Sequence, residues 1–133
     1  MKTTVCEEDT AEGRLQKRVV LFPFVEGDIP LALDDLIYIE TCRHKNLFYT
    51  KNGVFSIYRK LNEIEMELNG MGFLRIHQSF LVNMQYIMKI SSYLMTLTTG
   101  KELSVPKTRY PNVKKQYQQF QDLEKKISCA RTF

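Results

Sequence analysis

An apolar segment between residues 73 and 83 carries polar or basic side chains at regular places. A half-buried strand alternates apolar and polar residues, because successive side chains point to opposite faces of the sheet. One parity of this segment holds Phe73, Arg75, His77 and Ser79. The other parity holds Leu74, Ile76 and Gln78. The pattern predicts a strand with one face that is unusually polar for the core of a sheet.

The composition limits the classes of protein to which this chain can belong. The chain has 133 residues, 44% of them hydrophobic and 11% aromatic, so one domain with a real core is expected. No apolar run approaches the ~20 residues that cross a bilayer, and the acidic N-terminus does not resemble a signal peptide, which favours a cytoplasmic protein. The cysteines, Cys6, Cys42 and Cys129, form no Cys-x-x-Cys pair. We therefore expect reduced thiols, with no disulfide framework, metal site or cofactor.

Charge is sorted along the chain, although the net charge of +4 is modest. Residues 41–60 contain no acid and five basic residues: Arg43, Lys45, Lys51, Arg59 and Lys60. Residues 68–121 contain the single acid Glu102 and seven basic residues: Arg75, Lys89, Lys101, Lys107, Arg109, Lys114 and Lys115. Two interpretations stay open, one basic face that binds nucleic acid or ordinary solvated surface.

Short strands are expected in the first half of the chain, after a flexible acidic leader at residues 1–16. The expected strands cover residues 17–25, 34–40, 47–50 and 54–58, with a polar loop at 41–46. Pro23 cannot donate to a ladder, so it places the first strand at a sheet edge or a bulge. The Asn52-Gly53 pair predicts a type I′ hairpin, in which both central residues need positive φ.

The second half mixes helices with further strands. Leu61, Ile64 and Leu68 recur at helical spacing, which predicts an amphipathic helix at residues 60–69, ending at Gly70. Further strands are expected at residues 73–76, 86–91, 93–98 and 103–105, with a turn at 99–100. Apolar residues then recur at spacings of three and four, which predicts a C-terminal helix at 111–127. Its apolar stripe either packs on its own domain or forms a dimer contact.

The order of residue types from Phe73 to Asn83 resembles the signature of the LytTR DNA-binding domain family. Three further segments are similar to the same family in the same order: the strand ending in Glu40, the Asn52-Gly53 hairpin and the helix at 61–65. Residues 103–110 resemble its closing segment, with Lys107 where the family has Arg. The resemblance covers residues 17–120, and 121–133 form the helix end and tail. It implies an elongated, mainly β, antiparallel multi-sheet fold that places loops, not a recognition helix, in successive major grooves of double-stranded DNA.

The resemblance implies DNA contacts from three places. The first is the loop that offers Arg43, His44, Lys45 and Asn46; the second is Gln78; the third is the closing segment with Lys107 and Arg109, followed by Lys114. Glutamine can pair with adenine N6 and N7, whereas a lysine is a point charge better suited to phosphate. His77 and Asn83 are expected to be structural, with Asn83 capping a turn.

Catalysis is not expected. His77 and Ser79 lie two residues apart, but no glycine-rich oxyanion loop, phosphate-binding loop or metal-ligand spacing accompanies them. No small-molecule substrate is therefore expected. The alternative function is a β-rich protein-interaction module whose basic surface binds an acidic partner. Preference for one duplex over random DNA by ~10³ or more would separate these two readings.

The family resemblance also leads to expectations about domain organisation and assembly on DNA. LytTR domains are typical output domains of bacterial response regulators and usually follow a receiver domain, which this chain is too short to hold as well. We expect a stand-alone regulator, controlled by a separate inhibitory or signalling protein, with a fragment of a longer protein as the alternative. Family members often bind direct repeats as pairs of protomers, so a homodimer on DNA is expected, and a monomer stays open as the state of the free chain.

Overall fold

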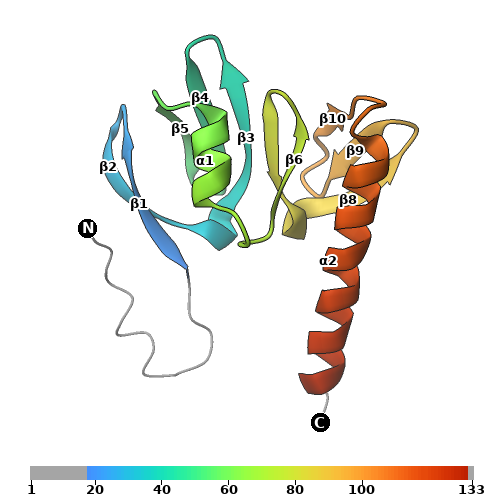
Figure 1. The fold of residues 1–133 in the computed structure, drawn as a ribbon. Helices are drawn as coiled ribbons and strands as arrows, with labels where there is room; N and C mark the ends of the chain where they lie inside the picture. The colour runs from blue at the N-terminus through green and yellow to red at the C-terminus, as the bar shows by residue number, and fades with distance from the viewer. Residues whose placement is uncertain (1–17, 132–133) are drawn as a thin grey trace. The chain divides into compact units, whose positions relative to one another are not determined.

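Antiparallel hairpins between sequence neighbours build most of the structure (Figure 1). The computed structural model describes residues 18–131, so the leader expected at residues 1–16 and the end of the tail lie outside the described residues. The chain divides into two compact units, the first ending at Ile64 and the second beginning at Glu65. The antiparallel sheets confirm the expected mainly β fold class.

The first unit opens with a two-stranded hairpin of β1 (Val19–Phe24) and β2 (Gly27–Ala32). Among the described strands, β1 pairs only with β2, so one side of it carries no ladder there, and Pro23 is tolerated. Of the two positions predicted from Pro23, a sheet edge or a bulge, the structure shows the edge. β2 itself was not predicted, because Asp28 and Pro30 are residue types that strands usually avoid.

Three antiparallel strands follow in the order β5-β4-β3. A 3-10 turn, η2 (Leu33–Asp35), leads into β3 (Leu36–Cys42), which pairs with β4 (Lys45–Thr50) and then β5 (Gly53–Ile57). The ladder continues through polar residues to the pair Cys42 and Lys45. The polar loop expected at residues 41–46 is therefore wrong in extent, and the turn consists of Arg43 and His44.

The hairpin between β4 and β5 is confirmed, but its expected type I′ turn is wrong. Thr50 pairs with Gly53, so the central residues are Lys51 and Asn52, and neither has a positive φ. The Thr50 side chain holds the turn instead: its Oγ1 donates to the Gly53 carbonyl at 2.8 Å and accepts from the Asn52 N–H at 3.0 Å. The Thr50 hydroxyl therefore stabilises this turn, whereas the sequence predicted a turn formed by positive φ angles at Asn52 and Gly53.

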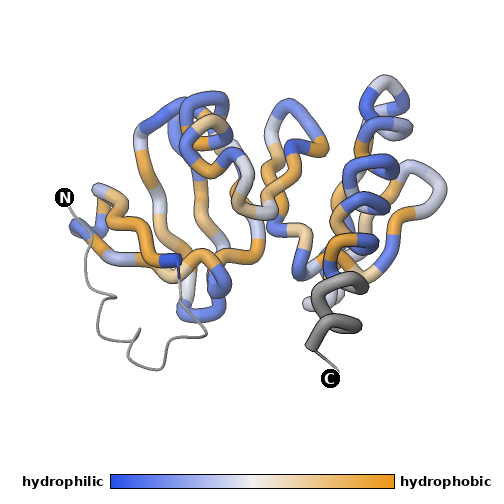
Figure 2. Tube along the Cα trace, turned by 60° about the horizontal axis from the view of Figure 1, so that its bottom comes forward, coloured by the Kyte–Doolittle hydropathy of each residue, from blue (hydrophilic) through white to orange (hydrophobic). Residues whose placement is uncertain are grey.

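Aromatic packing forms the core of the first unit. Phe22 and Phe24 project inward from β1, and Phe48 projects inward from β4, where buried and half-buried residues alternate. The Phe48 ring meets the Phe22 and Phe24 rings edge to face, with centroids 4.9 and 5.0 Å apart. Such edge-to-face pairs add to the stabilisation from burial alone. Hydrophobic residues lie along the strands, whereas the turns that join them are hydrophilic (Figure 2).

The short helix expected at residues 60–69 is confirmed as α1 (Leu61–Glu67). Leu61 and Ile64 are buried on one face, and Leu68 is buried directly after the helix. Gly70 follows with a φ of 81°, a left-handed conformation that glycine adopts without steric cost at helix ends.

The second unit contains a hairpin where the sequence predicted one strand. β6 (Phe73–His77) and β7 (Phe80–Asn83) are joined by Gln78 and Ser79, so β7 was missed. The Asn83 side chain then accepts a hydrogen bond from the Gln85 N–H at 3.1 Å and caps η3 (Met84–Tyr86). This confirms the capping role expected for Asn83.

A second sheet has the order β10-β9-β8, built from β8 (Ile87–Ser91), β9 (Leu94–Leu97) and β10 (Glu102–Ser104). These strands and the turn at residues 98–100 agree with the predictions to within a few residues. Their buried side chains include Met95, Leu97 and Leu103.

The C-terminal helix α2 (Tyr110–Arg131) confirms the helix expected from the apolar stripe. Val113 is fully buried, and the Tyr117 hydroxyl donates to the Ile87 carbonyl at 3.1 Å within the same unit. Further along, Leu123 is 57% exposed. The first part of the stripe therefore packs on its own unit. The Ile127 side chain lies outside the described residues.

Candidate nucleic-acid interface

The turn between β3 and β4 displays three of the side chains expected to contact DNA. Arg43 has a φ of 59°, and both Arg43 and His44 are exposed, while Lys45 is half-buried at the start of β4. Together with Cys42 and Tyr58 they line a hollow of about 410 Å³. The exposed Tyr58 ring beside three basic side chains was not expected from the sequence, because it follows a strand fifteen residues away from Arg43.

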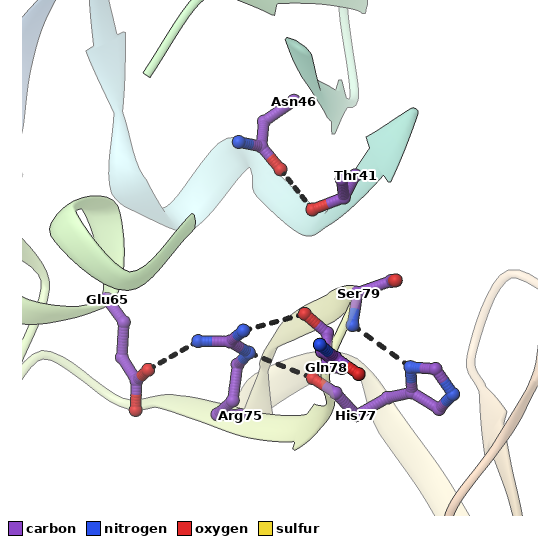
Figure 3. A network of polar contacts seen from close by, with 7 residues as sticks. All are labelled: Thr41, Asn46, Glu65, Arg75, His77, Gln78 and Ser79. Carbon is purple, nitrogen blue, oxygen red and sulfur yellow. Dashed lines mark hydrogen bonds and ion pairs between the residues drawn. The ribbon is translucent and has the colours of Figure 1, made fainter. Parts of the chain in front are cut away.

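Asn46, the fourth residue expected at this turn, has a structural position instead. It is 3% exposed, and its Oδ1 accepts a hydrogen bond from Thr41 Oγ1 at 2.6 Å (Figure 3). Its Nδ2 donates to the Arg59 carbonyl at 2.5 Å. Because the amide is buried and both its oxygen and its nitrogen are hydrogen-bonded within the protein, Asn46 is not available to pair with a base edge. It ties the base of the turn to the end of β5.

An acidic side chain lies close enough to Lys45 to interact with its charge. Glu26, between β1 and β2, accepts hydrogen bonds from the Ser56 N–H at 3.0 Å and from Ser56 Oγ at 3.2 Å. The Ser56 backbone bond is the largest influence that lowers the pKa of Glu26, and the charge of Lys45 lowers it further. The carboxylate is therefore held ionised and anchored to β5.

Arg75 braces the turn between β6 and β7 from within (Figure 3). Its Nε donates to the His77 carbonyl at 2.8 Å, and its Nη2 donates to the Gln78 carbonyl at 2.6 Å. Its Nη1 pairs with Glu65 Oε1 at 2.7 Å, and the arginine side chain is only 11% exposed. The guanidinium therefore holds the carbonyl groups of both His77 and Gln78 in place through coplanar N–H donors.

His77 is structural, as expected. Its Nδ1 accepts the Ser79 N–H at 3.0 Å, and its ring lies 5.1 Å from the Phe80 ring. Figure 3 shows the Ser79 hydroxyl directed away from the imidazole, so the two side chains do not form a nucleophile and base pair. Between them, Gln78 is exposed at the tip of the turn. The structure thus presents one amide side chain on a braced turn.

The third expected contact region surrounds the start of α2. Lys107 and Arg109 lie in the turn that leads into the helix, and Lys114 lies on its second turn; all three are exposed. The first turn of α2 contains no acidic residue. The Lys107 Nζ lies 5.8 Å from the centre of the Tyr93 ring, and the Lys114 Nζ lies 5.4 Å from that of Tyr110. Within the second unit, Lys107 and Lys114 therefore each contact a tyrosine ring.

Three tyrosine hydroxyls have altered acidity. Burial raises the pKa of the Tyr38, Tyr49 and Tyr117 hydroxyls, which keeps them protonated near neutral pH. Among the side chains that the structure describes, no group of three or more His, Cys, Asp or Glu is arranged to hold a metal ion. Within the described residues, no helix combines the length and apolar character required to span a membrane.

Comparison with known proteins adds independent information. The family model described as LytTr DNA-binding domain matches residues 26–118. The transcriptional regulatory protein LytR of Staphylococcus aureus (strain N315) is 27% identical over 94 residues, which cover 60% of this chain and 38% of that protein. The sensory transduction protein LytT of Bacillus cereus (strain ATCC 14579) is 24% identical over 98 residues, covering 70% of this chain and 40% of that protein.

A solved structure supports the fold. It is the LytTr DNA-binding domain of a Bacillus cereus protein described as a methyl-accepting/DNA response regulator, with a TM-score of 0.63 and 24% identity over 76% of this chain and 96% of that one. This chain spans about two fifths of the length of the curated relatives it matches. Because the family model covers most of the chain, this protein belongs to the LytTR DNA-binding domain family.

Proposed function

We propose that this chain is a sequence-specific double-stranded DNA-binding regulator of transcription that reads major grooves with turns of its β scaffold. The observation that carries the proposal is the braced turn at Gln78, where Arg75 bonds to two successive carbonyls and leaves the glutamine exposed. A turn fixed before binding loses little conformational entropy when it meets DNA. Membership of a DNA-binding domain family supports the same function.

Different side chains would serve different tasks. The Gln78 amide suits adenine N6 and N7, and Arg43 at the β3–β4 turn can offer two donors to guanine. His44 and Lys45 extend that contact at the same turn. The exposed cations near the start of α2 suit phosphates, which give affinity without sequence information: Lys107, Arg109 and Lys114.

Assembly on DNA follows from the same proposal. We infer that two protomers bind adjacent direct repeats, and that a separate inhibitory or signalling protein controls the free chain. Both inferences rest on the family resemblance. Binding by two protomers can be tested by footprinting on a duplex that carries one or two copies of a site selected from randomised duplexes. A pair of protomers should protect two adjacent copies at a lower concentration than an isolated copy requires.

The experiment that tests the function is selection from randomised duplexes with the purified chain, followed by affinity measurement on the enriched site. A sequence reader should favour that site over random duplex by ~10³ or more at moderate salt. Gln78→Ala should then lose about 1 to 3 kcal/mol on the selected site and relax the preference at one base pair. Gln119→Ala removes an equally exposed amide from α2 and serves as the matched control.

Each outcome bears on a separate part of the proposal. If Gln78→Ala weakens selected and random duplexes equally, Gln78 does not read bases. If no sequence is enriched and the chain instead retains an acidic polypeptide, it is a β-rich protein-interaction module. The Gln119→Ala variant should bind like the parent chain in either case.

A further inference from the structure

Two lysines and two tyrosines in the second unit form a continuous array, which we call the lysine–tyrosine array: Lys107, Tyr93, Tyr110 and Lys114. The Tyr93 and Tyr110 ring centres are 4.5 Å apart, with the ring planes tilted by 50°. The Lys107 Nζ lies over the Tyr93 ring and the Lys114 Nζ over the Tyr110 ring, at 5.8 and 5.4 Å from the ring centres. Both distances lie within the ~6 Å reach of cation–π attraction.

The backbone that carries Tyr93 adopts a costly conformation. Ser92 and Tyr93 join β8 to β9 with φ values of 53° and 61°, in the left-handed region. Glycine and asparagine adopt this region readily, whereas a bulky side chain is an outlier there. The Val105 N–H donates to the Tyr93 carbonyl at 2.9 Å and holds the turn in place.

Core packing does not account for keeping a tyrosine at this position. Tyr93 is 45% exposed, so about half of its surface remains in contact with solvent. The ring contacts Tyr110 and Lys107, both of which belong to the array. Backbone outliers that are retained without burial are concentrated at functional sites.

We propose that Tyr93 is a positioning residue that holds Lys107, and through Tyr110 also Lys114, as a pair of cations for the DNA backbone. A free lysine side chain loses considerable rotamer entropy when it binds a phosphate. A lysine already resting on a ring has lost part of that freedom, so the array makes phosphate binding by Lys107 and Lys114 tighter than by isolated lysines. The proposal rests on the DNA-binding function proposed above.

Two substitutions at Tyr93 separate the role of the ring from that of the backbone that carries it, and a third substitution is the control. Tyr93→Asn removes the ring and suits the left-handed conformation, so the melting temperature should stay the same or rise. Tyr93→Phe keeps the ring and should preserve DNA affinity. Lys101→Ala is the matched control, because Lys101 is an exposed lysine of the same unit outside the array.

Affinity for the selected duplex should be measured over a range of salt concentrations. Tyr93→Asn should weaken binding by about two- to fivefold and flatten the dependence of log K on log salt. Lys107→Ala should lower that slope by ~0.9, the value for one phosphate contact. In the Tyr93→Asn background, Lys107→Ala should have a smaller effect than in the parent chain.

Independent effects of Tyr93→Asn and Lys107→Ala would overturn the proposal, as would unchanged affinity in Tyr93→Asn. If Tyr93→Asn lowers the melting temperature, Tyr110→Leu tests the same coupling with Lys114 at a helical position. Full additivity there would also overturn it. A parent chain that binds no duplex would contradict the proposed function itself, which is a different result from loss of coupling in a chain that binds.

Discussion

Single polar side chains hold the turns of this protein by bonding to backbone groups. Asn46 donates to the Arg59 carbonyl, Arg75 donates to the His77 carbonyl, and Asn83 accepts from the Gln85 N–H. Across the described part of the chain, no buried side-chain nitrogen or oxygen lacks a hydrogen-bond partner. Satisfied polar groups of this kind specify one conformation, because the alternative conformations would leave a buried group unpaired.

Glu26 should make the stability of the first unit depend on pH. Its pKa is lowered chiefly by the Ser56 N–H, so its stabilising contribution is complete above its ordinary value of 4.5. That contribution is lost as the pH falls through the lowered folded-state pKa. Glu26→Gln should therefore be less stable than the parent chain at pH 7, and the two should converge toward pH 2 in urea denaturation.

Asp28→Asn provides the control for this measurement, because Asp28 is an exposed carboxylate on the neighbouring strand. Its difference from the parent chain should change less with pH than that of Glu26→Gln. A constant difference between Glu26→Gln and the parent chain from pH 7 to pH 2 would contradict the role given to the Ser56 bond.

At the scale of elements, strong periodic signals were predictable and side-chain-supported turns were not. The helical spacing of Leu61 and Ile64 identified α1, and the stripe after Pro111 identified α2. The break between the strands expected at residues 86–91 and 93–98 was predicted, but its geometry was not, because Ser92 and Tyr93 take up positive φ values where glycine or asparagine would be expected. β7 was missed because its apolar residues continue those of β6. The chain reverses at Gln78 and Ser79, where Arg75 donates hydrogen bonds to the turn carbonyls, and the sequence does not show these bonds.

Arg75→Lys should destabilise the hairpin of β6 and β7. A lysine keeps the charge but cannot reproduce the fork that bonds to Glu65 and to the two turn carbonyls. We expect a loss of about 1.5 to 3 kcal/mol in the free energy of unfolding, the range for hydrogen bonds to charged groups. Hydrogen exchange at the Ser79 amide should also accelerate, because its bond to His77 depends on the same turn.

Arg59→Lys is the matched control for this substitution. The Arg59 Nε lies 3.8 Å from Glu63 Oε1, in a pair whose side chains are 31% and 57% exposed. An exposed pair of this kind contributes ~0.3 to 0.5 kcal/mol. If Arg59→Lys and Arg75→Lys cost the same, Arg75 does not brace the turn as described.

For the whole molecule, the sequence indicated which basic side chains are accessible near turns, but it did not show what those side chains contact. The charge pattern pointed to Lys45, Lys107 and Lys114, which are at least partly accessible at or near turns of their own units. It could not show that Asn46 is buried, because an asparagine beside basic residues in a polar segment has the same sequence signature as an exposed one. It also gave no sign of the contact between Lys107 and Tyr93, which belong to different segments of the chain. Tyr110 and Lys114 are four residues apart on α2, so their contact follows from helical spacing.

If both units bind the same duplex, phosphate contacts from each should contribute independently. Lys45 belongs to the first unit and Lys114 to the second, and no interaction partner described above is common to both. Lys45→Ala and Lys114→Ala should each lower the slope of log K against log salt by ~0.9, on selected and random duplex alike. The double variant should lower it by the sum, because residues without shared partners act additively. A double variant that binds no more weakly than one of the single variants would mean that only one unit contacts DNA.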